Sequence, residues 1–152
     1  MRKAIPKALR QRVAERAHSI CEYCLIAEED TFFGCEVDHI ISVKHGGGND
    51  FHNLAYACLA CNRAKGSDLA SLASTGDLVG FFNPRKQRWQ DHFILDGTQI
   101  FPLSAVGEVT ADIFKFNIIE RLVERNTLSR IGRYLPDEAF AYLGEESEDE
   151  EF

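Results

Sequence analysis

The hydrophobic pattern near the N-terminal end of the chain predicts a helix over residues 6–18. Leu9, Val13 and Ala17 recur every four residues and give this segment one apolar face. Pro6 suits the first helical turn, where its missing N–H leaves no hydrogen bond unmade. The other faces carry the arginines Arg10, Arg12 and Arg16. These arginines form either an ordinary solvated surface or a set of contacts to a nucleic-acid backbone.

Alternating apolar residues predict a strand, or two short ones, over residues 31–43. The alternation places Val37, His39 and Ile41 on one face and Asp38 on the other. The residues that follow predict a glycine-rich loop, a second short strand and a helix, at 45–50, at 53–57 and from about 61 to 69. Together these segments predict a strand–loop–strand–helix unit.

The second half of the chain gives a less regular pattern. Residues 67–77 are expected to be the end of a helix and a turn. Asp96-Gly97, between two short apolar runs, is typical of a tight β-hairpin turn. Trp89 and Phe93 are expected to be core aromatic residues.

Three further helices are expected near the C-terminal end. Thr110 is a candidate cap for a helix that ends near Phe116, and Asn117 for the next one. The expected apolar face of that next helix consists of Ile118, Ile119, Leu122 and Val123. Residues 136–143 predict a last short helix.

Composition and charge restrict the class of protein. The chain has 152 residues, of which 45% are hydrophobic, which suits one domain with a real core. No apolar run approaches the roughly 20 residues that span a membrane, and no signal peptide is evident, so a cytoplasmic protein is expected. The net charge is −7, but the last eight residues carry −6 of it and the first eighteen carry about +5. A nucleic-acid partner is therefore not excluded, because local patches govern contact with phosphates.

Four of the five cysteines form two CxxC pairs, Cys21/Cys24 and Cys58/Cys61. In a reducing compartment this pattern favours a zinc site over disulfides. Four thiolates would leave no open position for water, so this zinc would have a structural role. Two redox-active pairs are the alternative. Cys35 remains and is expected to be a small buried hydrophobic residue.

Polar residues between the two pairs suggest a second, chemical site. His39 in an apolar strand is ordinarily a core residue, but here Asp38 precedes it and Asn62 adjoins a zinc ligand. Hydrolysis of a phosphodiester needs a base and a cation, and an imidazole titrates in a suitable range. One carboxylate and one amide oxygen are enough for Mg²⁺, which keeps several waters. Asp38 and Asn62 meet that requirement.

Taken together, these motifs resemble the HNH endonuclease family. The resemblance is carried by the two CxxC pairs, Asp38-His39-Ile40, Gly46-Gly47, Asn53-Leu54 and Cys61-Asn62-x-x-Lys65-Gly66. It implies an α+β fold with a ββα-metal unit. It also implies His39 as general base, Asp38 and Asn62 as ligands of the catalytic ion, and Asn53 as the residue that braces the loop.

The chain departs from the family's eponymous pattern at its third position, where Asn62 stands in place of a histidine. Such variants favour an oxygen-preferring ion, so Mg²⁺ or Mn²⁺ is the expected catalytic cofactor. Because strand alternation places Asp38 opposite His39, the strand must twist for both to serve one site. Otherwise Asp38 does not bind the ion itself and instead contacts the residues that do.

The resemblance extends beyond the motif. Residues 5–10 are similar to the lead-in of stand-alone family members, and residues 82–93 are similar to their C-terminal extension. The expected organisation has a basic helix, the HNH domain, the extension and a disordered acidic tail, at residues 1–20, 21–70, 71–143 and 144–152.

Several basic residues are candidates for nucleic-acid contacts. They are Arg10, Arg63, Lys65 and Arg85. For Arg63 and Lys65 the alternative is a solvated helix face, and for Arg85 it is an ion pair with an acidic neighbour.

The expected function is that of a metal-dependent DNA endonuclease that nicks one strand, with RNA as the alternative substrate. One rival is a non-catalytic zinc module that binds nucleic acid. Another is a protein-interaction adaptor that uses the aromatic C-terminal half and the acidic tail. The sequence carries no signal for the oligomeric state.

Overall fold

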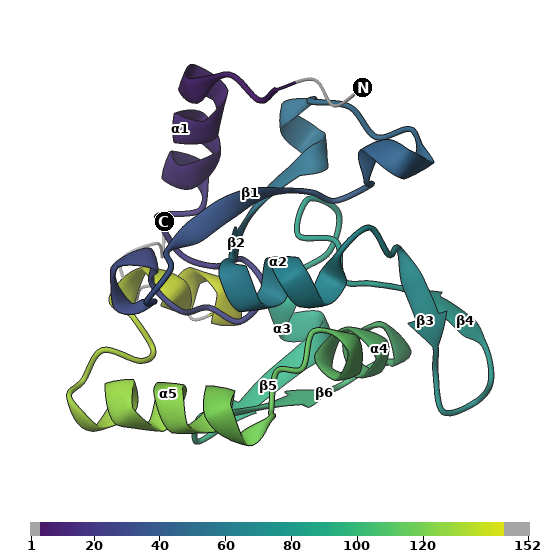
Figure 1. The fold of residues 1–152 in the computed structure, drawn as a ribbon. Helices are drawn as coiled ribbons and strands as arrows, with labels where there is room; N and C mark the ends of the chain where they lie inside the picture. The colour runs from purple at the N-terminus through teal and green to yellow at the C-terminus, as the bar shows by residue number, and fades with distance from the viewer. Residues whose placement is uncertain (1–3, 145–152) are drawn as a thin grey trace, which may run out of the picture.

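Two five-residue strands and the helix that follows them form the centre of the structure, a computed structural model that describes residues 4–144 (Figure 1). Strand β1 (Cys35–His39) pairs antiparallel with β2 (Leu54–Cys58), and α2 (Leu59–Lys65) follows directly. In the register, Cys35 lies opposite Cys58 and His39 lies opposite Leu54. The predicted strand–loop–strand–helix unit, hereafter the ββα unit, is therefore confirmed.

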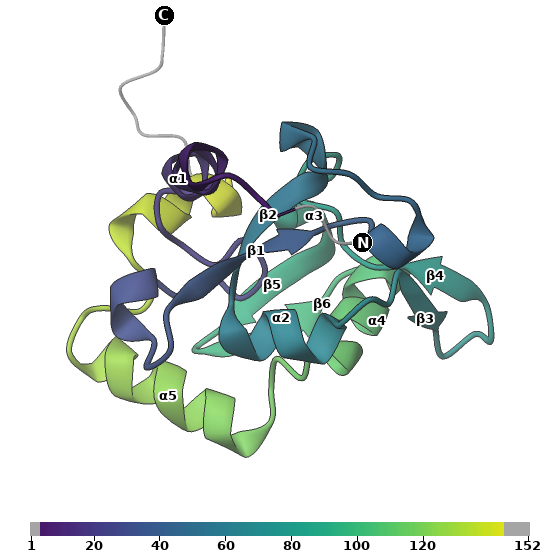
Figure 2. The same ribbon diagram turned by 45° about the horizontal axis from the view of Figure 1, so that its top comes forward.

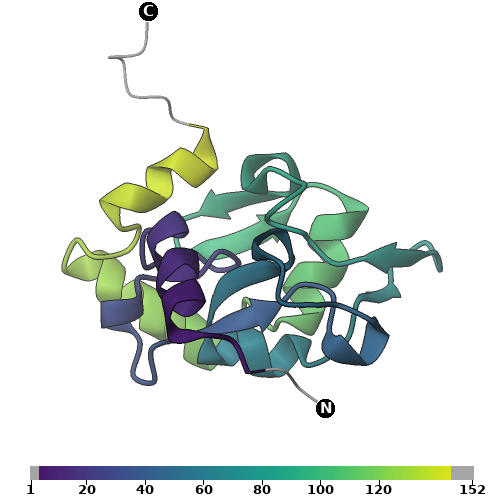
Figure 3. The ribbon, with the colours of Figure 1, turned by 90° about the horizontal axis from the view of Figure 1, so that it is seen from above.

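Helix α1 (Lys7–Arg16) covers one side of the ββα unit (Figure 3). A small apolar cluster joins the two and contains Ile5, Val13, Ala17, Leu54 and Tyr56. The helix ends earlier than the sequence predicts. His18 and Ser19 adopt left-handed backbone conformations, with φ of 55° and 54°, which end the helix after Arg16.

The remaining elements lie on the opposite side of the ββα unit from α1 (Figures 1 and 2). They are β3 (Ala70–Leu72), β4 (Leu78–Gly80), α3 (Trp89–His92), β5 (Phe93–Asp96), β6 (Gln99–Pro102), α4 (Ala105–Ile113) and α5 (Ile119–Arg130). Short 3₁₀ turns occupy Glu28–Asp30, Val43–His45, Phe51–Asn53 and Asp137–Leu143. The β3–β4 and β5–β6 pairs are two-stranded and antiparallel, and the former projects from the body.

An aromatic core joins the C-terminal elements to the first CxxC pair. Trp89 and Phe93 are each 2% exposed, which confirms them as core residues, and their rings lie 5.0 Å apart. The indole Nε1 of Trp89 donates to the carbonyl of Tyr23 at 2.9 Å. The Tyr23 ring in turn packs edge-on against Phe114 at 4.9 Å. The CxxC segment thus shares one core with residues far along the chain.

Two predictions of local structure are wrong. The strand expected over residues 31–43 is limited to β1, because Gly34 turns the chain with a φ of 72° and residues 43–45 form a 3₁₀ turn. Residues 67–77, expected to be helix and turn, contain β3 and the turn into β4. Gly66 ends α2, and the short β3–β4 pairing replaces the expected helical continuation.

The predicted β-hairpin around Gly97 is confirmed, although Asp96 pairs with Gln99 and the turn residues are therefore Gly97 and Thr98. Both predicted helix caps are wrong. Ser104 caps α4 instead of Thr110, and its hydroxyl accepts from the Gly107 N–H at 3.0 Å.

Thr110 and Asn117, the two residues predicted to be caps, form hydrogen bonds with residues far away in the chain. The Thr110 hydroxyl accepts from the Phe82 N–H at 2.8 Å, and the Asn117 amide bonds to both backbone groups of Ile100. Their polar side chains join separate elements where the sequence suggests local capping.

Helix α5 also departs from its predicted orientation. Ile119 and Val123, expected on the apolar face, are 67% and 55% exposed. The buried residues of this helix are Arg121 and Arg125. The two buried residues of α5 are therefore cationic, and Leu128 packs against the core as a partly buried residue.

No helix within residues 4–144 is long and apolar enough to span a membrane. Arg2 and Lys3 lie outside the described part of the chain, as do residues 145–152 of the acidic tail that is expected to be disordered over 144–152.

Helix α4 approaches its neighbours so closely at Gly107 that a side chain cannot be accommodated. A Cβ there would lie 2.1 Å from the His92 carbonyl oxygen and 3.3 Å from the Pro102 Cα. A Gly107→Ala change should therefore lower the free energy of unfolding by about 1–3 kcal/mol, as other overpacking changes do. Helix propensity alone predicts a gain of up to about 1 kcal/mol. Urea denaturation measures the sign, and a stabilised variant would contradict the close contact.

Candidate active site and metal centre

The two CxxC pairs meet in one buried cluster. Cys21 and Cys24 precede the ββα unit, whereas Cys58 ends β2 and Cys61 lies in the first turn of α2. The four sulfur atoms all lie within 4.8 Å of one another, and all four residues are buried. Residues 34 positions apart are thus held together at the base of the ββα unit.

The geometry of this cluster suits a tetrahedral metal ion. The Sγ atoms of Cys24 and Cys58 lie 3.7 Å apart. A tetrahedral site with metal–sulfur distances of about 2.3 Å has sulfurs about 3.8 Å apart, whereas a disulfide needs about 2.05 Å. Hydrogen bonds from the neighbouring thiols, Cys21 first, hold the pKa of Cys24 well below its ordinary value, whereas burial raises the pKa values of Cys21 and Cys61. The site could hold zinc.

The fifth cysteine is not part of the cluster. Cys35 lies opposite Cys58 in the sheet and is half-buried, so the expectation of a fully buried residue is only partly met. Burial raises the pKa of its thiol well above the ordinary value.

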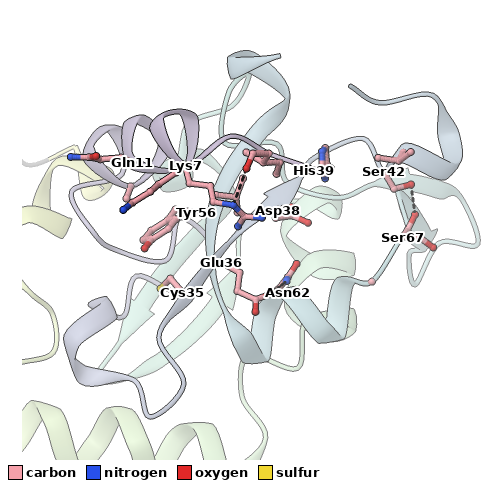
Figure 4. A pocket seen from close by; sticks show the side chains of 16 residues that line it. Lys7, Gln11, Cys35, Glu36, Asp38, His39, Ser42, Tyr56, Asn62 and Ser67 are labelled. Carbon is pink, nitrogen blue, oxygen red and sulfur yellow. Dashed lines mark hydrogen bonds between the residues drawn. The ribbon is translucent and has the colours of Figure 1, made fainter. Parts of the chain in front are cut away.

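His39 ends β1 and lines a pocket of about 670 Å³ that lies between α1, β1 and α2 (Figure 4). Its Nε2 lies 2.8 Å from the Oδ1 of Asn49. The Asn49 Nδ2 donates to the Ala4 carbonyl at 3.4 Å, which fits this orientation of the amide. With Oδ1 as acceptor, Nε2 carries the ring proton and Nδ1 keeps the free lone pair.

The amide of Asn53 braces the loop that follows His39. Its Oδ1 accepts from the Ile41 N–H at 2.9 Å, and its Nδ2 donates to the carbonyls of Ile41 and Gly48. Gly47 fits beside these groups only because it has no side chain, since a Cβ would lie 1.7 Å from the Ile41 carbonyl oxygen. Asn53 thus makes the contacts that a loop brace requires.

Asp38 lies on the buried side of β1 and is already engaged. Its carboxylate accepts from the Tyr23 hydroxyl at 2.8 Å and from the Lys65 ammonium at 3.2 Å. Lys65 also donates to the His39 carbonyl at 2.9 Å. Burial raises the pKa of Asp38, and the charge of Lys65 offsets part of that rise. The ion pair fixes the end of β1 to α2.

Asn62 faces a different carboxylate. Its Nδ2 donates to the Oε2 of Glu36 at 2.8 Å (Figure 4). Glu36 and Asp38 are two residues apart on β1 and share one face of the strand. Carboxylate and amide oxygens on this face fit the donor set that Mg²⁺ or Mn²⁺ prefers. The structure brings Asn62 to Glu36 directly, and Asp38 lines the same pocket.

Residues of α1 form the facing wall of the pocket. Lys7, Arg10, Gln11 and Ala14 line it, and they recur at helical spacing. Arg10 thus lines the same pocket as His39, and its contact with nucleic acid stays a prediction. Lys7, Gln11, Glu36 and Asn49 were missed by sequence reasoning. Lys7 lies three residues before Arg10 and four before Gln11, so helical spacing places Lys7 and Gln11 on the same face as that candidate and could have indicated both.

The other basic candidates lie in different surroundings. Arg63 is exposed on α2. Lys65 is only 2% exposed and is paired with Asp38, and Arg85 is paired with the buried Glu22. For Arg85 this is the ion pair that the sequence left as the alternative. In these positions Lys65 and Arg85 neutralise carboxylates.

A ββα unit with a buried four-cysteine site and a histidine at the end of its first strand defines a recognisable class of protein. Residues 21–68 match the model of the family described as HNH endonuclease, so this part of the chain is an HNH domain, of the variant type with a four-cysteine site that fits zinc. The matched segment runs from the first cysteine of the cluster to just past α2. No curated protein matches the chain significantly.

The metal site predicts a strong dependence of folding on Cys58. Cys58→Ser should release the metal and leave the chain unfolded or aggregated, because the energy of thiolate binding is also folding energy. Metal content by mass spectrometry and circular dichroism measure both effects. Cys35→Ser is the matched control and should retain metal and fold. A folded, metal-free Cys58→Ser protein would contradict a structural role.

The ion pair between Lys65 and Asp38 predicts a second effect on stability. Lys65→Met leaves the Asp38 carboxylate buried without its cation, which should lower the free energy of unfolding by about 3–5 kcal/mol. Arg133→Met is the control, because its pairs with Glu29 and Asp30 are more exposed to solvent and should matter little. Chemical denaturation of both variants makes the comparison, and equal losses would count against the buried pair.

Proposed function

We propose that the protein is a metal-dependent DNA endonuclease that hydrolyses phosphodiester bonds one strand at a time. HNH domains act on nucleic acids, and residues 21–68 form such a domain. The observation that carries the proposal is the position of His39, which lines one pocket together with Asp38, Asn62 and Arg10. A base, two oxygen ligands and a cationic side chain are the groups that this reaction requires.

In the proposed reaction, His39 takes the proton from an attacking water. The Asn49 amide keeps the ring proton on Nε2, so Nδ1 is the nitrogen that accepts. Lys65 holds the carbonyl of His39, and Asn53 holds the loop beside it, so the imidazole has a fixed orientation. Fixed geometry lowers the barrier because the water and the base need not be ordered during the reaction.

Asn62 and the carboxylates of β1 would hold the catalytic ion, Mg²⁺ or Mn²⁺. When bound, this ion supplies Lewis-acid stabilisation of the charge that develops on the departing oxygen. Asp38 remains the predicted carboxylate ligand. Its role requires that its carboxylate be shared with Lys65 or released from it.

Helix α1 would hold the nucleic acid. Lys7 and Arg10 line the wall opposite the catalytic residues, where cationic groups attract a phosphate backbone. The Arg10 Nε donates to the Ile5 carbonyl, which orients the guanidinium, and its terminal nitrogens bond to no group within residues 4–144. Arg63, exposed on α2, is a further proposed contact. With zinc in the four-cysteine site, one small domain would hold both a structural metal and a catalytic metal.

A plasmid assay tests the proposal. Supercoiled DNA is incubated with the protein and Mg²⁺ or Mn²⁺, and with a chelator as the metal-free control. The wild type should produce nicked circles only with the divalent ion, and His39→Ala should lower the rate about 10²- to 10⁴-fold, the usual contribution of a general base. His52→Ala is the matched control, because His52 is exposed on the neighbouring loop and does not line the pocket.

The same assay separates the alternatives. A wild type that shifts DNA in a gel but nicks it with neither ion is a non-catalytic binding module. Cleavage of a labelled RNA in preference to DNA would reassign the substrate. Nicking by His39→Ala at the wild-type rate would exclude His39 as the base.

A further inference from the structure

Helix α5 turns two arginines toward the interior of the protein. Arg121 and Arg125 are 7% and 1% exposed, while Ile119 and Val123 on the same helix face solvent. Burying a guanidinium is costly unless an opposite charge or hydrogen bonds compensate it. The partners of these two arginines therefore explain why the helix packs with this face inward.

The two arginines have different partners. Arg125 bonds to neutral groups, since its Nε donates to the Thr98 carbonyl at 2.7 Å and its Nη2 donates to the Asn117 Oδ1 at 3.2 Å. Arg121 instead reaches the four-cysteine cluster. Its Nη2 lies 3.2 Å from the Sγ of Cys61 and 3.7 Å from the Sγ of Cys58.

The second terminal nitrogen of Arg121 fixes its orientation. This Nη1 donates to the Phe114 carbonyl at 2.9 Å. Within residues 4–144, Arg121 forms no ion pair with a carboxylate. The cysteine sulfurs are therefore the anionic groups that the Arg121 guanidinium contacts directly.

The charges of the metal centre require such a partner. A divalent ion bound by these four thiolates would give a site with a formal charge of about −2, and all four cysteines are buried. Bonds between N–H groups and sulfur disperse this charge, and a buried cation reduces it further.

We propose that Arg121 is a positioning residue of the metal centre, and that helix α5 docks on the HNH domain through the charge of the metal-bound thiolates. Arg121 lies well outside the matched residues 21–68, so the domain's metal centre is completed by a helix that is not part of it. The inference follows from the cysteine cluster and does not depend on nuclease activity. It predicts that metal binding and the docking of α5 are coupled.

Replacement of Arg121 tests the contact. Arg121→Gln should weaken zinc binding about 10- to 100-fold, measured by competition with a chromophoric chelator, as is typical when an outer partner of a metal site is lost. In the cobalt-substituted protein, the thiolate-to-cobalt charge-transfer bands should move to lower energy, because sulfur that loses N–H donors gives up electrons more readily. Arg121→Lys retains the charge, so its zinc affinity and its cobalt band energies should lie between those of the wild type and those of Arg121→Gln.

Arg125→Gln is the matched control. It removes a buried arginine one turn further along α5 that bonds to no sulfur, so the protein should lose stability with no shift of the cobalt bands. Equal band shifts in the Arg121→Gln and Arg125→Gln variants, or none in a folded Arg121→Gln protein, would overturn the proposal.

The zinc site also allows a measurement on the wild type, which does not depend on the variants folding. In the cadmium-113-substituted protein, the guanidinium protons of Arg121 should show a coupling to the cadmium nucleus by NMR, because an N–H···S hydrogen bond transmits it through the sulfur. The guanidinium of Arg125, which bonds to Thr98 and Asn117, should show none. A folded, cadmium-loaded protein with no coupling at Arg121 would show that α5 docks without a bond to the sulfurs.

Discussion

The compensation of buried charge is the constraint on which this structure depends. The ββα unit has two strands of five residues and a helix of seven, which are too short to be stable alone. The four cysteines join these elements to the segment that precedes them, and a metal ion there would contribute its binding energy to folding. The thiolates that make this possible are also a concentration of negative charge inside the protein.

The same constraint recurs around the site in three buried pairs. Lys65 neutralises Asp38, Arg85 neutralises Glu22, and Arg121 faces the thiolates of Cys58 and Cys61. In each pair the cation comes from a later part of the chain than the anion. Each pair therefore joins separate elements, and loss of one partner would leave an uncompensated charge in the interior. These contacts hold β1, the first CxxC pair and α2 in place.

The sequence predicts the parts of the fold that local rules determine. The CxxC spacing, the alternation in β1 and the turn at Gly97 led to the metal site, the ββα unit and the β5–β6 hairpin. The position of the candidate base, His39, could also be anticipated. Each of these features depends on residues close together in the chain or on ligands of one unmistakable type.

Features that depend on distant partners could not be predicted. The apolar stripe of α5 suggests that Ile119 and Val123 face inward, but the helix packs with the opposite face inward and Arg121 on that face contacts the Cys61 sulfur. Thr110 and Asn117 looked like caps because capping is local, whereas their actual partners lie 28 and 17 residues away. Polar residues with long-range partners carry no periodic signal.

Helix α2 shows why structure and chemistry are so closely combined here. In one helix of seven residues, Cys61 belongs to the metal cluster, Asn62 faces the pocket and Lys65 holds both Asp38 and the carbonyl of His39. A helix this short has few contacts of its own, so its position is set by what its ends bind. Arg121 and the cluster fix its first turn, and the Asp38 pair fixes its last. The proposed catalytic geometry is therefore determined by two buried charge interactions at opposite ends of a single helix.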